Sequence, residues 1–207
     1  MDKNVIKQII LNQQDFIGRI KLQSRNVCFE ENANYVLVGI RRAGKSYMLY
    51  QHIQHLVANG HSIEEMLFIN FEDERISDIR KEDLYLVLEA YRELFAFQPI
   101  IFLDEIQNVE GWEHFARRLA DEKYRVFITG SNAHMLSREI SSTLGGRYLT
   151  KEIRPFSFSE YLEYHNIHLL QHWELSPIRA DVVRLFSDYF YYGGLSEVFD
   201  IQDKKSW

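Results

Sequence analysis

The sequence of 207 residues has little of three residue types that shape small folds: it holds one cysteine, three prolines and ten glycines. A single cysteine, Cys28, excludes an internal disulfide framework and a four-cysteine zinc site. The shares of glycine and proline lie below the averages of about 7 % and 5 %. Few positions therefore relax the backbone, and the places where the glycines fall are informative.

Long apolar runs are also absent from the sequence. The longest, at 35–40 and 99–103, fall far short of the roughly 18 apolar residues that a membrane helix needs. The N-terminus does not read as a signal peptide, because Lys7, Gln8 and Asn12 interrupt its apolar residues and no small-residue cleavage site follows. We therefore expect a cytoplasmic protein that does not enter a membrane.

The balance of charge is acidic, with a formal net charge of −6. This argues against a generally basic nucleic-acid binder, although not against a local basic groove. Hydrophobic residues make up 46 % of the chain, enough for a sizeable core, so disorder of the whole chain is excluded. The sequence has one modest basic stretch, made of Arg117, Arg118, Lys123 and Arg125. No stacking aromatics are interleaved with it, so nucleic acid is a possible partner that the sequence does not specifically indicate.

Short apolar runs alternate with stretches of helical spacing. The runs predict four buried strands, at 35–38, 66–71, 100–103 and 125–129. Apolar residues recur every three or four positions between them, within 48–57, 84–95 and 112–120. Strands that are apolar on both faces and alternate with helices predict an α/β fold, with a parallel sheet sandwiched by helices.

The pattern changes after about residue 150. Ser157 and Glu160 have the spacing of a capping box and predict the start of a helix. A second helical face ends at Gly193 and Gly194, which predict a C-cap. We therefore divide the chain into a core over 1–153 and a helical extension over 154–207, and we expect the extension to be the start of a truncated C-terminal region.

The segment GIRRAGKS fits the pattern of a P-loop, two glycines four residues apart followed by Lys-Ser. Glycines suit the sharp turn and let backbone N–H groups point at phosphate oxygens, while Lys45 reaches the phosphates and Ser46 binds Mg²⁺. Arg41 and Arg42 either add positive charge near the phosphates or a partner, or point to solvent. The predicted nucleotide-binding set is Gly39, Ile40, Arg41, Arg42, Ala43, Gly44, Lys45, Ser46 and Tyr47.

A second signal lies in IIFLDEIQ, an apolar strand that ends in Asp104 and Glu105. A carboxylate at the carboxyl end of a strand suits Mg²⁺ opposite Ser46, which makes Asp104 the second predicted metal ligand. Glu105 suits a base that orients the attacking water. Paired with the P-loop, this string predicts binding and hydrolysis of a nucleoside triphosphate.

The motifs together resemble those of P-loop ATPases of the AAA superfamily, the class with an additional strand and a catalytic glutamate. The resemblance is closest to prokaryotic AAA ATPases whose loop reads Gly-x-Arg-Arg-x-Gly-Lys-Ser/Thr. It covers the loop, the Asp-Glu-Ile-Gln segment with its following Gly-Trp, FITGSN at 127–132, Gly146-Arg147, the 155–161 segment and Tyr192–Gly194. Ser196 and Ile40 stand where that family usually has proline.

The resemblance implies a sheet in which the strand of Thr129 lies between those that lead to Lys45 and Asp104. It implies that Ser131, or alternatively Thr129, is a polar sensor of the γ-phosphate. Arg147 is implied as an arginine finger or sensor, acting in cis or from a neighbouring subunit. A homo-oligomer or a protein partner, and a further C-terminal domain, are implied as well.

The function we predict is Mg²⁺-dependent hydrolysis of ATP, coupled to movement or regulation of a partner or a further domain. ATP is preferred to GTP because the sequence has no Asn-Lys-x-Asp string. One alternative is a small-molecule kinase: the Asp-Glu-x-Gln string resembles that of thymidine kinases, although their cysteine zinc site cannot be built from one cysteine. The other is a nucleotide-gated interaction module that does not hydrolyse its ligand.

Overall fold

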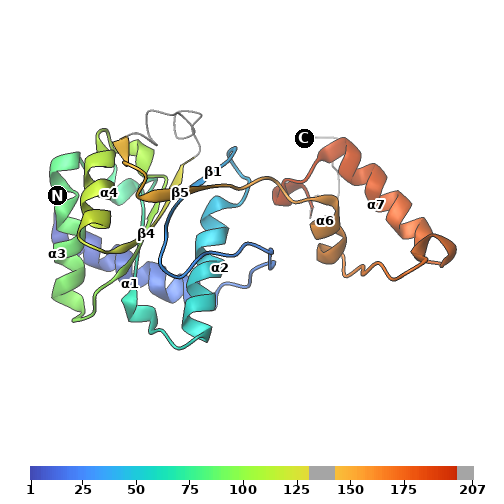
Figure 1. Cartoon of the computed structure of the whole chain (residues 1–207), viewed down its shortest axis with the longest axis horizontal. Coiled ribbons are helices and arrows are strands. Elements are labelled where there is room, and N and C mark those ends of the chain that lie inside the picture. Colours follow the sequence, from blue (N-terminus) through green and yellow to red (C-terminus); the bar gives the residue numbers. More distant parts are fainter. Residues whose placement is uncertain (131–142, 200–207) are drawn as a thin grey trace. The chain divides into compact units, whose positions relative to one another are not determined.

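The computed structural model describes residues 1–130 and 143–199 (Figure 1). The order of elements follows the predicted alternation of strands and helices. The helices and strands are α1 (Lys3–Arg19), β1 (Asn34–Val38), α2 (Lys45–Ala58), β2 (Met66–Asn70), α3 (Tyr85–Leu94), β3 (Ile100–Asp104), α4 (Trp112–Asp121), β4 (Arg125–Gly130), β5 (Tyr148–Glu152), α6 (Phe158–Tyr164) and α7 (Arg179–Tyr192).

The five strands form one sheet in the order β2-β3-β4-β1-β5, and every neighbouring pair is parallel. All carboxyl ends therefore lie at the same edge of the sheet. Strand β4, which contains Thr129, lies between β1 and β3 as predicted. The α/β fold with a parallel sheet between helices is confirmed.

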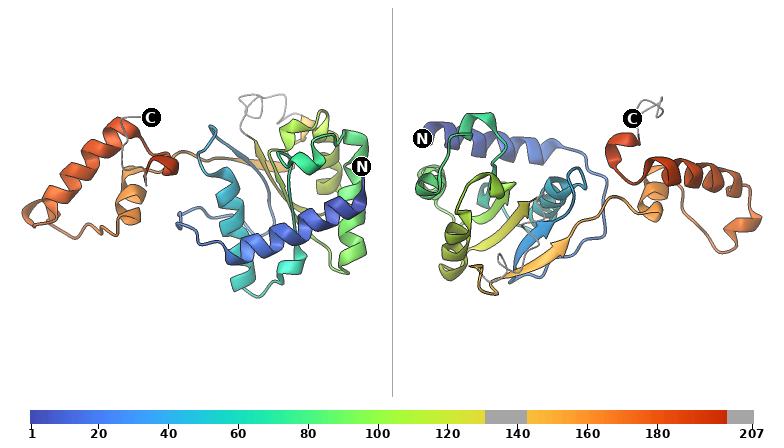
Figure 2. Two further views of the ribbon diagram at one scale, coloured as in Figure 1. Left: turned by 180° about the vertical axis from the view of Figure 1, so that it is seen from behind. Right: turned by 90° about the horizontal axis from the view of Figure 1, so that it is seen from above.

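One face of the sheet is covered by α1, α3 and α4. Alternate strand residues such as Val36, Ile101 and Val126 point to this face because the side-chain period of a strand is two. They form one buried cluster with residues of the three helices. Helix α1 packs against α3 and β2 at this face (Figure 2).

The opposite face is aromatic and is covered by α2. Phe102 and Phe127 stack with ring centroids 5.0 Å apart, and His52 of α2 lies 4.6 Å from Phe127. Tyr50, two residues earlier on α2, lies 5.2 Å from Phe68 of β2. These contacts hold α2 over the strands, and the first residue of that helix is Lys45.

The contacts divide the chain into two compact units. The first unit holds 1–39 and 45–152, and the second groups 40–44 with the residues from 153 onward. The second unit has its own small core, which includes Phe156, Tyr161 and Leu185. The division into a core over 1–153 and an extension over 154–207 stays a prediction.

Both predicted helices of the extension are present. The Ser157 side chain accepts from the N–H of Glu160 and the Glu160 side chain accepts from the N–H of Ser157, which is the capping box predicted for α6. Helix α7 ends at Gly193, whose N–H donates to Tyr189 O at 2.8 Å. Among the described residues, no helix is long and apolar enough to cross a membrane.

Among the α-helices and strands of the described residues, two were not predicted. Helix α1 was missed because Lys7, Gln8 and Asn12 interrupt its sequence, yet Ile6, Ile9, Ile10 and Ile17 lie on its buried side. Strand β5 was missed because it lies at the edge of the sheet and none of its five residues is buried. Its sequence therefore lacks the apolar run that marked the other four strands.

Candidate functional site

The phosphate loop connects the end of β1 with the start of α2. Two of its residues have left-handed backbones, Arg42 with φ 64° and Gly44 with φ 91°. The N–H of Ala43 donates to Ile40 O at 3.3 Å and closes a turn within the loop. Left-handed residues next to right-handed ones turn successive N–H groups toward one side, and the helix N-terminus adds its positive end. The loop is therefore shaped to bind an anion.

Lys45, the first residue of α2, is buried with 3 % of its side chain exposed. A buried ammonium group must have polar partners, because burial removes its hydration. Its Nζ donates to Gly39 O at 3.3 Å and lies 3.5 Å from Glu105 Oε1. The amine is thus held between the end of β1 and the acid that follows β3.

Asp104 ends β3 and is almost fully buried. Its Oδ1 accepts hydrogen bonds from Ser46 Oγ at 3.0 Å and from Thr129 Oγ1 at 2.5 Å. Burial raises the pKa of Asp104 to about 6, while the bonds from Thr129 and Ser46 act in the opposite direction. Residues 58 and 25 positions away in sequence therefore converge on one carboxylate oxygen.

Glu105 follows with a left-handed backbone, φ 51°, which is unusual for a residue with a side chain. Its N–H donates to Thr129 Oγ1 at 2.9 Å, and its Oε2 accepts from Gln107 Nε2 at 2.5 Å. Strained backbones of this kind concentrate at functional sites, where surrounding contacts hold them. Gln107 was not predicted as a site residue, although it belongs to the Asp-Glu-Ile-Gln segment.

The structure brings together five residues of the first unit: Lys45, Ser46, Asp104, Glu105 and Thr129. Ser131, the other predicted sensor, lies outside the described residues. Ile40 and Tyr47 are exposed, with 59 % and 52 % of their surface accessible. Their membership of the predicted nucleotide-binding set therefore depends on their backbone N–H groups and not on their side chains.

The structure does not bring Arg147 to this site. The residue precedes β5, beside Asn34 at the amino end of β1, whereas the loop follows the carboxyl end of the same strand. At about 3.3 Å per residue, a five-residue strand separates the two ends by about 15 Å. Arg147 Nε instead donates to Asp121 Oδ1 at 2.5 Å. The geometry gives no support to a role within the same chain, and a role from a neighbouring chain stays a prediction.

The donors near Asp104 fit a hard divalent cation. A serine hydroxyl and a carboxylate are oxygen ligands, and Mg²⁺ characteristically takes one or two such protein ligands together with water and substrate phosphates. Ser46 Oγ and Asp104 Oδ1 already lie 3.0 Å apart at the carboxyl edge of the sheet. Both predicted metal ligands are therefore placed where one ion can meet them.

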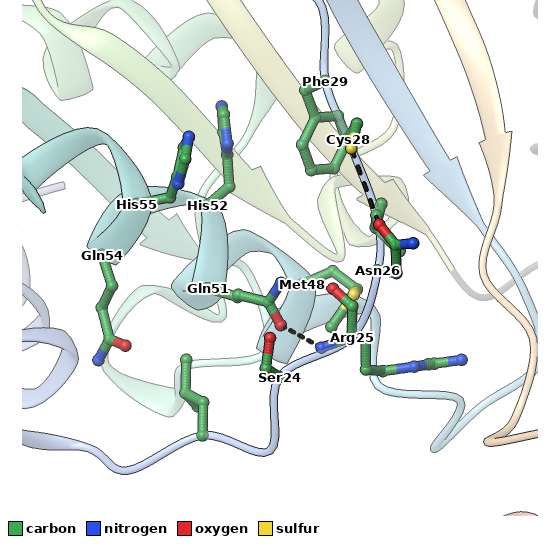
Figure 3. A pocket seen from close by; sticks show the side chains of 12 residues that line it. Ser24, Arg25, Asn26, Cys28, Phe29, Met48, Gln51, His52, Gln54 and His55 are labelled. Atoms are coloured by element: carbon green, nitrogen blue, oxygen red, sulfur yellow. Dashed lines mark hydrogen bonds between the residues drawn. The ribbon is translucent and has the colours of Figure 1, made fainter. Parts of the chain in front are cut away.

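A separate cavity of about 650 Å³ lies along α2, beside the segment 22–29 (Figure 3). Gln51 fixes that segment, because it accepts from Arg25 N at 2.9 Å and donates to Arg25 O at 2.7 Å. His52, also at this cavity, is buried, and its Nε2 has no hydrogen-bond partner within the described part of the chain. Burial lowers the pKa of His52 to about 3, helped by the charges of Arg125 and His55. None of the phosphate-site residues lines this cavity.

The parallel sheet, the loop at the start of α2 and the acid pair after β3 define a P-loop nucleoside triphosphatase fold. The profile of the AAA domain family matches residues 31–162, and the chain belongs to that family. A solved structure with a similar fold is that of PCH-2 from C. elegans, with a TM-score of 0.52 and 14 % identity over 98 % of this chain and 63 % of that one.

Two curated relatives are longer than this chain. An uncharacterized protein of Methanocaldococcus jannaschii, MJ1544, is 32 % identical over 207 residues, which are 99 % of this chain and 45 % of the relative. An uncharacterized protein of Haemophilus influenzae is 36 % identical over 165 residues, which are 79 % of this chain and 39 % of the relative. The chain thus spans less than half the length of either relative.

Proposed function

We propose that the chain binds ATP with Mg²⁺ and hydrolyses it to ADP and phosphate. The observation that carries this proposal is the buried group at the carboxyl edge of the sheet, where Lys45 lies against Glu105 and Thr129 joins Glu105 to Asp104. Membership of the AAA domain family supports nucleotide binding. Buried charged groups with specific partners cluster at functional sites, which supports a role in handling a charged ligand.

Each side chain has a distinct task in this proposal. Lys45 and the loop N–H groups hold the β- and γ-phosphates and offset their charge. Ser46 and Asp104 hold Mg²⁺, which when bound neutralises charge on the phosphate oxygens. Glu105 accepts a hydrogen bond from the attacking water and turns its oxygen toward the γ-phosphorus. The new P–O bond forms as the bond to the β-phosphate oxygen breaks, and the water proton leaves toward Glu105.

Thr129 takes the part of the polar sensor in this proposal. Its hydroxyl contacts both Asp104 and Glu105 and so fixes the metal ligand relative to the base. We further propose that hydrolysis moves a partner or a further domain, because the relatives continue well beyond the length of this chain.

The proposal is tested by following ADP and phosphate with and without Mg²⁺ over a range of protein concentrations. Equal amounts of ADP and free phosphate, formed only with Mg²⁺, are expected. ADP formation that requires an added acceptor and releases no phosphate would show a kinase. Tight binding of Mg·ATP with no turnover at any concentration would show a nucleotide-gated module. A super-linear rise of the rate with concentration would mean that a neighbouring chain completes the site.

A further inference from the structure

The Tyr192–Gly194 segment has no task in the phosphate site, yet its geometry is demanding. Gly193 has φ 75° and ψ −171°, a region that is essentially restricted to glycine. A Cβ on Gly194 would lie 2.0 Å from Phe156 O, so a residue with a side chain does not fit there. Phe156 N also donates to Gly194 O at 2.8 Å. The two glycines let the chain turn closely against Phe156.

The turn leads into a short 3₁₀ helix over Ser196–Val198, which places one exposed acid. Val198 and Phe199 are buried, and the Phe199 ring lies 4.7 Å from that of Tyr161. Between these anchors and the glycines stands Glu197, whose Oε2 lies 3.1 Å from Nη1 of Arg42. Within the second unit, an acid of the extension therefore contacts the phosphate loop.

Arg42 is the loop residue for which such a contact matters most. Its left-handed backbone, φ 64°, carries a steric cost for arginine that glycine does not have. Such a conformation persists only when surrounding contacts hold it. It is also one of the two left-handed positions that shape the loop for an anion.

We propose that Glu197 is a positioning residue for the phosphate loop, which holds the Arg42 guanidinium and thereby keeps the Arg42 backbone in the conformation that binds phosphate. This inference rests on the proposed nucleotide site. The side chains of Arg42 and Glu197 are 58 % and 46 % exposed, so the effect of the pair is modest. Loss of an exposed pair corresponds to about a twofold to fivefold change in an equilibrium constant.

The test is a double-mutant cycle with Glu197→Gln, Arg42→Gly and the double variant. The dissociation constant of Mg·ATP is measured for each by calorimetry. Glu197→Gln alone is expected to weaken binding about twofold to fivefold. In the R42G background the same change is expected to have no measurable effect, because glycine adopts a positive φ without help. Equal weakening in both backgrounds, or none in the wild type, would overturn the proposal.

Hydrogen exchange of the 40–44 amides, without nucleotide, gives a second reading on the same variants. Glu197→Gln is expected to raise exchange in the wild-type background and not in the R42G background, and unchanged exchange would overturn the proposal. Glu163→Gln is the matched control, since it removes another exposed acid of the extension and leaves Glu197 intact. If the wild-type chain binds no ATP, the proposed function fails while the exchange data still decide the role of Glu197.

Discussion

Thr129 Oγ1 donates a hydrogen bond to Asp104 Oδ1 at 2.5 Å, across the neighbouring strands β4 and β3. The same hydroxyl oxygen accepts the N–H of Glu105 at 2.9 Å. One buried threonine thus joins the carboxylate assigned to Mg²⁺ with the backbone of the acid assigned to the water. The two acids are therefore linked through one side chain.

Thr129→Val is expected to lower the rate of phosphate release at saturating ATP by tenfold or more. Valine keeps the shape of threonine but removes the hydroxyl that donates to the Asp104 carboxylate. A hydrogen bond to a charged group is worth about 1.5–3 kcal/mol. The affinity for ATP is expected to change little, because Thr129 does not belong to the loop. Thr129→Ser retains the hydroxyl and is the matched control. Equal rates in the valine and serine variants would remove Thr129 from this role.

Asp104→Asn is expected to stabilise the fold at pH 7 while it abolishes Mg²⁺-dependent turnover. The pKa of Asp104 is raised from its ordinary 3.8 to about 6 in the folded state. Between these two pH values the folded state holds a proton that the unfolded state has lost. Its ionisation therefore reduces stability as the pH rises through this window. Urea unfolding in EDTA should show a gain of about 1–3 kcal/mol at pH 7.

The same comparison at pH 3 provides the control for Asp104. At pH 3, well below both pKa values, the carboxyl group is protonated in both states, so the advantage of asparagine should vanish. An advantage of the same size at both pH values would show that ionisation of Asp104 is not its cause.

His52 should give the fold a distinct sensitivity to acid. Its pKa in the folded state is lowered to about 3, so between pH 6.5 and pH 3 only the unfolded state takes up the proton. Stability that is present above pH 6.5 is therefore lost as the pH falls. From pH 7 to pH 5, His52 accounts for about 1–2 kcal/mol of the loss.

Urea unfolding of His52→Leu at pH 7 and pH 5 measures this contribution. The variant should lose less stability than the wild type over the interval. His114→Leu, at an exposed position of α4, should lose as much as the wild type. If His52→Leu loses as much stability between pH 7 and pH 5 as the wild type, the lowered pKa of His52 is contradicted.

The core strands and the phosphate loop could be predicted because their signals are local. Strands β1 to β4 are short apolar runs buried on both faces, and the loop spacing is dictated by phosphate geometry. Strand β5 and helix α1 were missed, since none of the residues of β5 is fully buried and polar residues interrupt α1. The hydrophobic pattern of the sequence is weak in elements that are only partly buried.

Contacts that depend on the order of the strands and the path of the chain could not be predicted from the sequence pattern. The place of Arg147 depends on the parallel pairing of β5 with β1, which puts it at the amino end of the sheet. The pair of Arg42 and Glu197 joins residues 155 positions apart through a turn at two glycines. Such contacts follow from the path of the chain, which residue spacing does not encode.

The most direct test of the proposed site compares the wild type with Glu105→Gln in ATP binding and in phosphate release. The amide keeps the size of the side chain but cannot accept the proton of the attacking water. The account predicts ATP affinity within about threefold of the wild type and phosphate release reduced about 100-fold or more. Lys45→Ala, by contrast, should lose ATP binding in addition to phosphate release. Phosphate release by Glu105→Gln as fast as that of the wild type would contradict the account.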